Sequence, residues 1–413
     1  MGETLYFSPL SFPLYVMAKP VGPLCNMACD YCYYLEKSEL YAGSKSYKMS
    51  DEMLERFIDT YINCQTTPIV LFTWHGGETL LRGLDFFRKA MRLQRKYSRG
   101  REVSNCIQTN GLLINDEWCR FFKDNNFLIG ISIDGPERLH DHYRQDCGGH
   151  GTFKRVMRGI ELMQQHGVDF NTLSVINDYN IGYPVEIYRF FKEIGSQFMQ
   201  FTPIVERLGS RDDGLELLTA DDQPEDMELA PWSVSPLAYG NFYIRMFDEW
   251  VRHDVGQYYV QLFDATLACT VGEPPGVCLY AKTCGHALAM EHNGDVYACD
   301  HFVYPEYLRG NIQHDSLVSI TLSADQQRFG SDKHTRLPHH CQTCPYLHLC
   351  HGECPKNRIA TTPDGEYGLN YLCPGLKKYF THVTPHMQFM AEELRNHRPP
   401  SNIMQSNLVQ SKH

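Results

Sequence analysis

The sequence lacks a hydrophobic run that could cross a membrane, since a transmembrane helix needs about 18 consecutive apolar residues. It also lacks the features of a secretory signal, because no basic residue precedes Lys19 and two prolines, Pro9 and Pro13, interrupt the apolar stretch. Positive charge is in deficit: 38 Lys and Arg face 49 Asp and Glu, for a net charge of −11. These absences predict a cytoplasmic protein whose main partner is neither a nucleic acid nor a membrane.

Cysteine, in contrast, is abundant, with 16 in 413 residues. A chain of this length, 43% hydrophobic, has enough apolar content for a core without disulfide staples. In a reducing compartment, clustered cysteines usually bind metal or carry out redox chemistry. The clustered ones are Cys25, Cys29 and Cys32, then Cys278, Cys284 and Cys299, then Cys341, Cys344, Cys350 and Cys354, and finally Cys373. The scattered ones, expected to be small buried core residues, are Cys64, Cys106, Cys119, Cys147 and Cys269.

Between the first two cysteine groups, apolar β-branched runs alternate with segments of helical period. The predicted strands are Leu14–Ala18, Pro68–Trp74, Val103–Ile107, Phe127–Ile133, Phe170–Ile176 and Phe198–Pro203. The predicted helices are Asp51–Asn63, Leu84–Tyr97, Asp116–Asn125, Thr152–His166 and Tyr183–Ile194. This alternation predicts a parallel α/β sheet, either open or curled into a partial barrel. In such folds the chemistry collects at the carboxyl ends of the strands.

The pattern changes after the sixth predicted strand. The acidic stretch Arg207–Glu228 is typical of a solvated surface loop, or of a rim that attracts a basic peptide. A predicted helix over Pro236–His253 precedes a cysteine-rich region with few long periodic segments, which is typical of a region held together by metal. We therefore expect domains at 14–235 and 236–390, and a frayed polar tail at 391–413.

The first cysteine group has the spacing C-x-x-x-C-x-x-C, directly after the first predicted strand. Three thiolates on one loop can hold three corners of a 4Fe–4S cluster and leave one iron open to a small molecule. The alternatives are a three-ligand zinc site or unligated thiols, although structural zinc normally takes four protein ligands. With Tyr31 before the last cysteine, the motif resembles the radical S-adenosylmethionine superfamily, in which the open iron binds S-adenosylmethionine and the cluster cleaves it to a 5′-deoxyadenosyl radical.

The resemblance continues at the ends of later strands and implies a partial (β/α)6 TIM-like barrel. The segment His75–Thr79 is similar to the family's Gly-Gly-Glu-Pro motif, with threonine in place of the proline. The implied cofactor contacts are Gly76, Gly77 and Glu78 at the methionine amino group, Ser132 at the ribose, Arg144 at the carboxylate, and Tyr31 and Val205 at the adenosine. Without the resemblance, Ser132 is an ordinary turn residue after a strand and Arg144 a solvent-exposed arginine.

The eight later cysteines make two complete sets of four, and two four-cysteine zinc sites would satisfy the same count. Their spacing resembles the SPASM extension of radical enzymes, which implies two auxiliary 4Fe–4S clusters and three clusters in all. The implied ligand sets are Cys278, Cys284, Cys299 and Cys354 for one cluster, and Cys341, Cys344, Cys350 and Cys373 for the other. Complete ligation leaves no iron open, which suits electron transfer.

Over roughly residues 14–390 the chain resembles the anaerobic sulfatase-maturating enzymes, above all at Val296–His301, where Asp300 follows a cluster cysteine. The resemblance implies oxidation of a cysteine or serine in an unfolded or nascent sulfatase polypeptide to Cα-formylglycine. It further implies Asp300 as the general base, auxiliary clusters as electron acceptors, and an external electron donor such as flavodoxin or ferredoxin. Tyr34 and His75, the latter at a position where the subfamily often has glutamine, are implied substrate contacts.

Two of these residues also have simpler interpretations. Asp300 would be a turn residue that accepts a hydrogen bond near the cluster, and Tyr34 would be an exposed aromatic residue without a role. Two other functions also remain. One is a SPASM-type enzyme that crosslinks a ribosomal peptide, which is less expected because only about 14 residues precede the first strand, where such enzymes often carry a peptide-recognition domain. The other is a non-catalytic zinc or iron–sulfur interaction module. The preference between serine and cysteine targets is not determined by the sequence.

Overall fold

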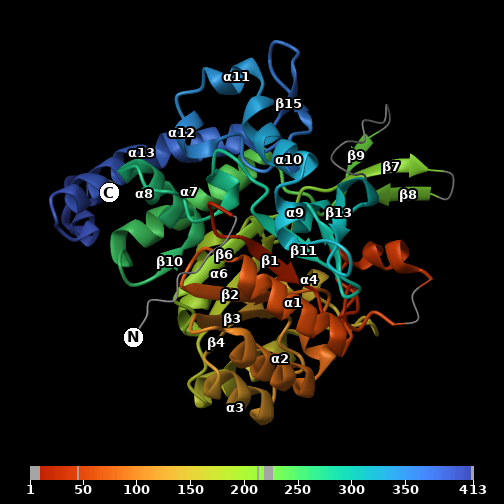
Figure 1. Cartoon of the computed structure of the whole chain (residues 1–413). Helices are drawn as coiled ribbons and strands as arrows, with labels where there is room; N and C mark the ends of the chain where they lie inside the picture. Colours follow the sequence, from red (N-terminus) through yellow and green to blue (C-terminus); the bar gives the residue numbers. More distant parts are fainter. Residues whose placement is uncertain (1–9, 44–45, 212–213, 218–226, 411–413) are drawn as a thin grey trace, which may run out of the picture. The chain divides into compact units, whose positions relative to one another are not determined.

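The computed structural model describes residues 10–43, 46–211, 214–217 and 227–410 (Figure 1). It divides into two compact units, each assembled from separate stretches of chain. The first unit consists of Met1–Ser132, Arg144–Phe170 and Cys284–Ser331. The second unit consists of Ile133–Tyr143, Asn171–Thr283 and Asp332–His413. Among the described residues, no helix has the length and apolar character needed to cross a membrane.

The first unit is built on a sheet in which the strand order is β4-β3-β2-β1-β11-β12-β13. These strands are β1 (Tyr15–Ala18), β2 (Ile69–Trp74), β3 (Glu102–Thr109), β4 (Phe127–Ser132), β11 (Ala287–Met290), β12 (Asp295–Tyr297) and β13 (Leu308–Asn311). Strands β1 to β4 and β11 run parallel, whereas β12 and β13 are antiparallel additions. The parallel pairing of β1 with β11 joins the start of the chain to the region that contains Asp300.

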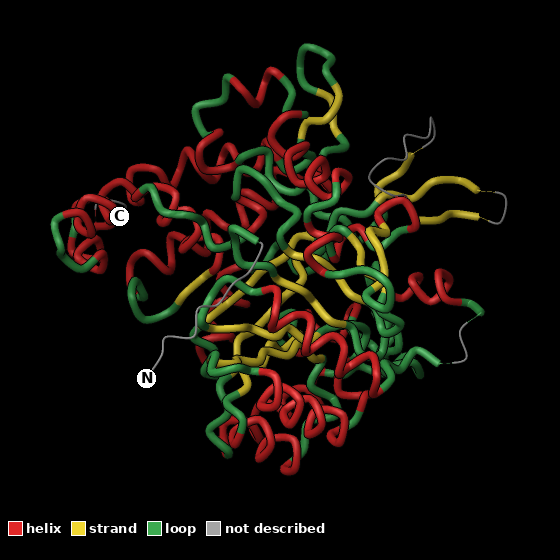
Figure 2. The backbone as a smooth tube through the Cα atoms, viewed as in Figure 1, coloured by secondary structure: helices red, strands yellow, loops and turns green. Residues whose placement is uncertain are grey.

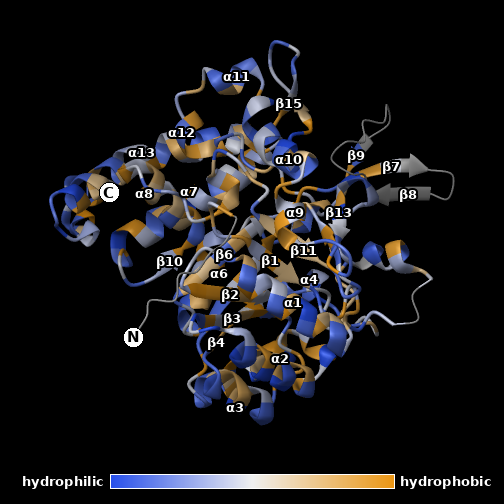
Figure 3. Ribbon diagram, in the orientation of Figure 1, coloured by the Kyte–Doolittle hydropathy of each residue, from blue (hydrophilic) through white to orange (hydrophobic). Residues whose placement is uncertain are grey.

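The first unit contains the helices that connect its parallel strands β1 to β4, as the alternating pattern predicts, together with further helices. They are α1 (Asp51–Cys64), α2 (Leu84–Tyr97), α3 (Asp116–Asp124), α5 (Phe153–Gln165), α9 (Leu317–Thr321) and α10 (Ala324–Thr335, which runs on into the second unit), with 3-10 turns η1 (Leu35–Tyr41), η2 (Thr79–Arg82), η4 (Asp300–Phe302) and η5 (Pro305–Tyr307). Figure 2 shows the strands in yellow beside these red helices. In Figure 3, β1 to β4 are largely apolar while α1 to α3 carry both colours, because one face of each helix is buried.

Local sequence accounts for the helix boundaries. Helix α1 begins after Ser50, whose hydroxyl accepts a hydrogen bond from the Met53 amide at 3.1 Å, and two acidic residues occupy its first turn. Helix α3 begins after Asn115, whose side chain accepts from two backbone amides of the first turn. The predicted strands and helices between residues 14 and 203 are confirmed, with boundaries that differ by two residues or fewer at nearly every end.

The second unit contains a parallel group with strand order β10-β6-β5, a three-stranded antiparallel sheet β8-β7-β9 and a small hairpin β14-β15. Its strands are β5 (Phe170–Ile176), β6 (Phe198–Pro203), β7 (Arg207–Arg211), β8 (Gly214–Leu217), β9 (Met227–Leu229), β10 (Tyr259–Val260), β14 (Ala360–Thr361) and β15 (Tyr367–Leu369). Its helices are α4 (Glu137–Tyr143), α6 (Pro184–Glu193), α7 (Pro236–His253), α8 (Gln261–Val271), α11 (His339–Gln342), α12 (Leu347–Cys350), α13 (Cys373–Arg395) and α14 (Asn407–Gln410), with 3-10 turns η3 (Cys278–Tyr280), η6 (Pro355–Asn357) and η7 (Pro400–Gln405).

Helices α7 and α13 cross closely in the second unit because glycines face each other at the crossing. A Cβ on Gly375 would lie 1.9 Å from the Pro236 carbonyl oxygen, and one on Gly240 would lie 2.4 Å from the Gly375 oxygen. Only glycine permits this approach. Farther along the crossing, His382 contacts Asp248 through its Nε2 atom at 2.7 Å. The long helix α13 corrects the expectation that the cysteine-rich region has few long periodic segments.

Two further expectations are wrong. The stretch Arg207–Glu228, expected to be a loop, supplies strands β7 and β8 and the start of β9, because an antiparallel ladder satisfies its backbone groups. Its residues 212–213 and 218–226, with most of the expected acidic rim, lie outside the described residues. The tail expected to fray forms η7 and α14, tied down where Glu393 accepts hydrogen bonds from Arg398 and Asn402 and where Ile403 is fully buried.

Candidate active site

The loop after β1 carries the first three cysteines in a compact turn. The Cys32 amide donates to the Cys29 carbonyl at 2.9 Å, and the Met27 amide donates to Cys25 Sγ at 3.4 Å. Cys29 is buried and the other two cysteines are partly exposed. Three sulfur donors on one short loop fit the three protein-ligated corners of a 4Fe–4S cluster. Burial raises the pKa of Cys25 to about 11, so binding of iron by this thiol would release a proton.

The glycine-rich segment after β2 lies directly against the chain that leads into Cys25. The Gly77 amide donates to the Gly22 carbonyl at 2.8 Å, and the Glu78 amide donates to the Leu24 carbonyl at 2.7 Å. A Cβ on Gly77 would lie 2.1 Å from the Leu24 oxygen, and Gly76 has a φ of +129°. Both positions therefore require glycine, Gly77 for close approach and Gly76 for its backbone conformation. The structure thus brings the predicted Gly76–Glu78 segment to the cysteine loop.

Glu78 is fully buried and its carboxylate is held from three sides. Oε1 accepts hydrogen bonds from Thr109 Oγ1 and from the Leu80 amide, and Oε2 accepts from the Asn110 amide, all at 2.8 Å. Burial raises the pKa of Glu78, and these hydrogen bonds oppose the rise. Asn110 also donates to Cys25 Sγ at 3.7 Å. The polar segment Gln108–Gly111, at the carboxyl end of a predicted strand, fits the family resemblance, but no role was assigned to Thr109 or Asn110 from the sequence.

Of the other predicted cofactor contacts, Tyr31 and Arg144 are brought together. Arg144 is 7% exposed and its guanidinium carbon lies 5.6 Å from the centre of the Tyr31 ring, so the interpretation as a solvent-exposed arginine is wrong. Ser132 ends β4, and its hydroxyl accepts from Gln108 Nε2 at 2.8 Å. Val205 is buried within the second unit, after β6.

Asp300 lies in a buried group of charged and aromatic side chains that we call the Asp300 cluster: Lys19, Tyr33, Tyr34, Glu291 and Asp300. The Lys19 ammonium, fully buried, forms an ion pair with Asp300 Oδ1. The Tyr33 hydroxyl donates to Asp300 Oδ2 at 2.8 Å. The Tyr34 hydroxyl donates to Glu291, and the Lys19 ammonium sits 3.5 Å from the centre of the Tyr34 ring. All five belong to the first unit.

The Asp300 cluster corrects the interpretation of the aromatic pair. Tyr34 is 5% exposed, so it is not an exposed aromatic, and its contacts are with Lys19 and Glu291. The direct contact with Asp300 comes from Tyr33, one residue earlier. Sequence reasoning missed Tyr33, Lys19 and Glu291. The only signal for Lys19 was its place at the carboxyl end of a parallel strand, where site residues collect.

Charge in this cluster favours an ionised Asp300. Burial by itself opposes ionisation, but the neighbouring Lys19 ammonium outweighs it through its charge and its hydrogen bond and holds the pKa of Asp300 well below its usual range. His75 Nδ1 accepts from the Gly76 amide at 2.8 Å, and burial lowers the pKa of His75. Its imidazole is therefore neutral at pH 7 with the proton on Nε2, which makes Nε2 a hydrogen-bond donor.

The four cysteines of the second implied ligand set all belong to the second unit, and electrostatic interactions link Cys341 with Cys344 and Cys373 and link Cys350 with Cys341 and Cys373. Burial raises the pKa of Cys341 to about 11, and electrostatic interaction with the nearby Cys373 and Cys344 raises it further. Cys350 has a pKa raised to about 12 by burial, with Cys373 and Cys341 again among its neighbours. Four sulfur donors in one region fit complete ligation of a cluster.

The other set of four divides between the units. Cys278 and Cys354 are neighbours in the second unit, where the Lys333 ammonium donates to the Cys278 and Leu279 carbonyls. Cys284 and Cys299 belong to the first unit. Among the described residues, no group of three or more His, Cys, Asp or Glu side chains is arranged to hold a single metal ion.

The five scattered cysteines only partly match the expectation of buried core residues. Cys64 and Cys119 are buried, and Cys106 and Cys269 are partly exposed. Cys147 is exposed, because it lies in the turn between Asp146 and Gly149 rather than under a helix or strand, so the expectation is wrong for this residue.

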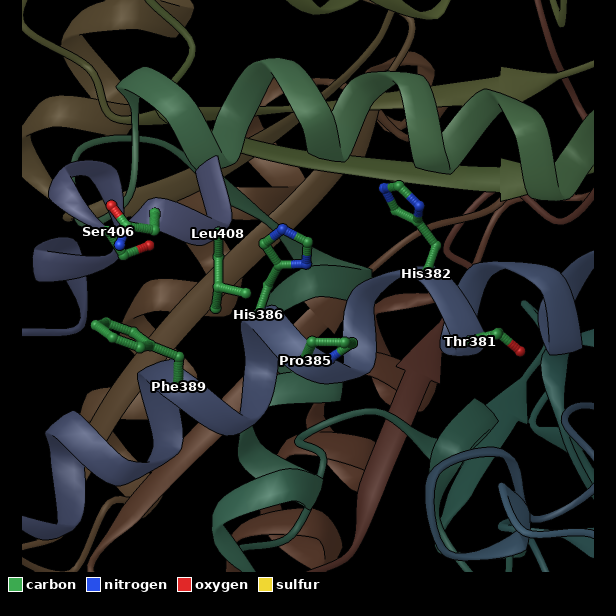
Figure 4. A pocket seen from close by; sticks show the side chains of 8 residues that line it. Thr381, His382, Pro385, His386, Phe389, Ser406 and Leu408 are labelled. Carbon is green, nitrogen blue, oxygen red and sulfur yellow. The ribbon is translucent and has the colours of Figure 1, made fainter. Parts of the chain in front are cut away.

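The second unit also contains a surface pocket apart from every predicted site residue. It lies between α13 and the last turns of the chain, and its lining residues are Thr381, His382, Pro385, His386, Phe389, Ser406, Asn407 and Leu408 (Figure 4). His382, on its rim, is already engaged by Asp248 at 2.7 Å. The pocket therefore contributes nothing to the chemistry of the cysteine loop or of Asp300.

The comparisons with known proteins match both cysteine-containing regions of the chain to known families. The radical SAM superfamily profile matches residues 20–191, and the SPASM iron–sulfur cluster-binding domain profile matches residues 282–345. The serine-type anaerobic sulfatase-maturating enzyme of Bacteroides thetaiotaomicron is 56% identical over 97% of this chain and 96% of its own length. The cysteine-type enzyme of Clostridium perfringens is 31% identical over 93% of this chain and all of its own length. A solved structure of native anSMEcpe with bound AdoMet matches with a TM-score of 0.79 at 30% identity, covering 92% of this chain and 100% of that one.

Proposed function

Because the chain belongs to the family of anaerobic sulfatase-maturating enzymes, we propose that it oxidises a serine of a sulfatase polypeptide to Cα-formylglycine, with Asp300 as the proton acceptor. The chain is a radical SAM enzyme, with the α/β fold of that superfamily and a SPASM iron–sulfur domain. The observation that carries the residue assignment is the Asp300 cluster, in which a buried lysine and a tyrosine hydroxyl hold the carboxylate beside Cys299.

The cofactors give the site its radical chemistry, and the chain supplies binding and proton transfer. When bound, the cluster on the first cysteine loop and S-adenosylmethionine supply the radical that removes a hydrogen atom from the substrate carbon. Glu78, a buried acceptor next to the cysteine loop, suits an ammonium group, as the resemblance implies for the cofactor. Asp300 takes the proton that the substrate hydroxyl must lose to become an aldehyde. His75, with its proton on Nε2, offers the substrate a donor.

The proposed cofactor contacts are those that the family resemblance implies, and these placements support them. The segment Gly76–Glu78 binds the methionine amino group. Arg144, whose guanidinium carbon lies 5.6 Å from the centre of the Tyr31 ring, pairs with the cofactor carboxylate. The proposal also places Ser132 at the ribose and Val205 at the adenosine. Tyr34 acts at the substrate side of the site, where its ring contacts the Lys19 ammonium. In this proposal the domains are 14–235, 236–390 and 391–413.

Three 4Fe–4S clusters are proposed: one on Cys25, Cys29 and Cys32, one on Cys278, Cys284, Cys299 and Cys354, and one on Cys341, Cys344, Cys350 and Cys373. We expect anaerobically reconstituted protein to contain about twelve iron and twelve sulfide per chain, which iron and sulfide assays measure. Cys341→Ala should lower both figures to about eight, whereas Cys147→Ala, at the exposed cysteine outside the ligand sets, should leave them unchanged. Stoichiometric zinc in the wild-type protein would contradict the cluster assignment.

The proposed target is serine, because the serine-type relative is 56% identical and the cysteine-type relative 31% identical. The partner is an unfolded or nascent sulfatase polypeptide, and a small electron-transfer protein such as flavodoxin or ferredoxin supplies the electron; a nucleic acid or a membrane has no place in this reaction. A solved relative was crystallised with a peptide, which supports a peptide substrate here.

The test uses two sulfatase-derived peptides that differ only in serine or cysteine at the target position, incubated anaerobically and read by mass. The serine peptide should lose two hydrogens. A cysteine peptide, if converted, would lose two hydrogens and also exchange sulfur for oxygen. Faster conversion of the cysteine peptide would contradict the serine preference. Absence of an aldehyde from both peptides, with S-adenosylmethionine still cleaved, would contradict formylglycine formation and return attention to peptide crosslinking, which the relatives do not favour.

A further inference from the structure

We propose that Lys19 is the positioning residue for Asp300: it fixes the carboxylate so that Oδ2 is the oxygen that receives the substrate proton. This inference rests on the proposed function, and it adds a residue that none of the sequence motifs includes. Lys19 lies just after β1, far along the chain from Asp300, and its side chain is 0% exposed.

The sheet brings Lys19 and Asp300 together. β1 pairs in parallel with β11, with Ala18 opposite Met290, and the Lys19 amide donates to the Met290 carbonyl at 2.8 Å. From Met290 the chain turns through the β11–β12 hairpin and then reaches Cys299 and Asp300. Backbone hydrogen bonds therefore fix Lys19 at the end of β1, and Asp300 approaches it from the chain that follows β12.

The surroundings of Lys19 restrict its ammonium to one position. The ion pair with Asp300 Oδ1 is accompanied by Glu291 Oε1 at 4.0 Å and by the face of the Tyr34 ring at 3.5 Å. Tyr34 in turn donates to Glu291, so the two groups that flank Lys19 also hold each other. Burial of a lysine costs free energy that an apolar residue would not, and a buried ion pair is weak evidence for a stabilising role. The arrangement is better explained by what it does to Asp300.

The two carboxylate oxygens of Asp300 are not equivalent. Oδ1 is completely buried beside Lys19, while the Asp300 side chain as a whole remains 16% exposed. Oδ2 accepts a hydrogen bond from the Tyr33 hydroxyl, and a hydroxyl can rotate its hydrogen away. After the substrate carbon has lost a hydrogen atom, the substrate O–H bond breaks, its proton goes to Oδ2 and the C–O bond becomes a carbonyl; an auxiliary cluster held by Cys278, Cys284, Cys299 and Cys354 would accept the remaining electron. Lys19 takes no proton and stays in place throughout.

The experiment compares wild-type protein, Lys19→Met and Lys89→Met in deuterated water with a serine peptide and a chemical reductant. Lys89→Met is the matched control, because it removes a surface ion pair with Asp51 at 2.7 Å. For Lys19→Met we expect 5′-deoxyadenosine at the wild-type rate and formylglycine lowered about 10²-fold, the cost of misplacing a reacting group by about 1 Å. The substrate carbon radical that is not converted to the aldehyde then takes an electron from the reductant and a deuteron from the solvent. Serine recovered from the reaction should therefore gain one deuterium.

A purely structural role would lower iron content and cofactor cleavage together and would leave no deuterium in the peptide. An unchanged ratio of formylglycine to 5′-deoxyadenosine in Lys19→Met would overturn the inference. If that variant does not fold, Lys19→Met with Glu291→Gln removes the lysine together with one of its carboxylate neighbours and is expected to show the same uncoupling. Failure of the proposed function itself is distinguishable, because it appears in the wild-type sample as cofactor cleavage without formylglycine.

Discussion

Replacement of Cys25 by alanine is expected to abolish reductive cleavage of S-adenosylmethionine. The first loop offers three sulfur donors for a cluster that leaves one iron without a protein ligand. Removal of one of these three donors should therefore prevent the loop from holding the cluster. Loss of Cys25 also removes the acceptor that Asn110 contacts at 3.7 Å, which links the loop to the Glu78 site. Iron should fall from about twelve to about eight per chain, because the other two clusters have separate ligands.

The measurement is 5′-deoxyadenosine formed per chain under anaerobic conditions with a chemical reductant. Cys106→Ala provides the matched control, since Cys106 is a partly exposed thiol on β3 that donates to Thr73 at 3.3 Å and belongs to none of the ligand sets. The control should cleave the cofactor at the wild-type rate and keep its iron. Persistent cleavage by Cys25→Ala would remove this loop from the mechanism.

Asp300→Asn is expected to separate cofactor cleavage from product formation. Asparagine has nearly the shape of aspartate but cannot accept a proton at neutral pH, so the loss should reflect general-base chemistry, which contributes about 10²- to 10⁴-fold. 5′-Deoxyadenosine should still form, because Asp300 is not among the proposed cofactor contacts. Formylglycine should fall by about the same 10²- to 10⁴-fold, as read from the peptide mass spectrum.

Asp295→Asn is the matched control for the loss of a carboxylate in the same hairpin. The Asp295 carboxylate accepts hydrogen bonds from Asn293 and Asn311, at 2.7 and 2.8 Å, and its backbone carbonyl accepts one from the Glu291 amide at 2.8 Å, which the substitution keeps. It should leave the ratio of formylglycine to 5′-deoxyadenosine near the wild-type value. Wild-type formylglycine yield from Asp300→Asn would exclude Asp300 as the base and direct attention to another acceptor in the site.

Local pattern was sufficient for much of the fold. Apolar β-branched runs and helical periodicity located the strands and helices between residues 14 and 203, because burial on one face or both faces imposes those periods on the sequence. The Gly76–Glu78 segment was identified by its resemblance to a family motif, and the structure adds the reason for one glycine, because a Cβ on Gly77 would collide with the Leu24 carbonyl. Pattern failed at Arg207–Glu228, where the acidic composition suggested a loop but β7 pairs with β8 and β9 of the same stretch.

The sequence by itself grouped Cys25, Cys29 and Cys32, since ligand spacing on a short loop is a local property that chemistry constrains, whereas the division of the eight later cysteines into two sets stays a prediction from the family resemblance. It also placed an aspartate directly after Cys299. Only the tertiary structure decided what surrounds that aspartate: Tyr33 and Asp300 are 267 positions apart, and Lys19 meets Asp300 because β1 pairs with β11. Which of two adjacent tyrosines contacts the carboxylate depends on loop geometry. The physical reason is that strand pairing and burial act across the whole chain. Charged residues that meet inside a protein therefore have no characteristic spacing in the sequence from which their contact could be predicted.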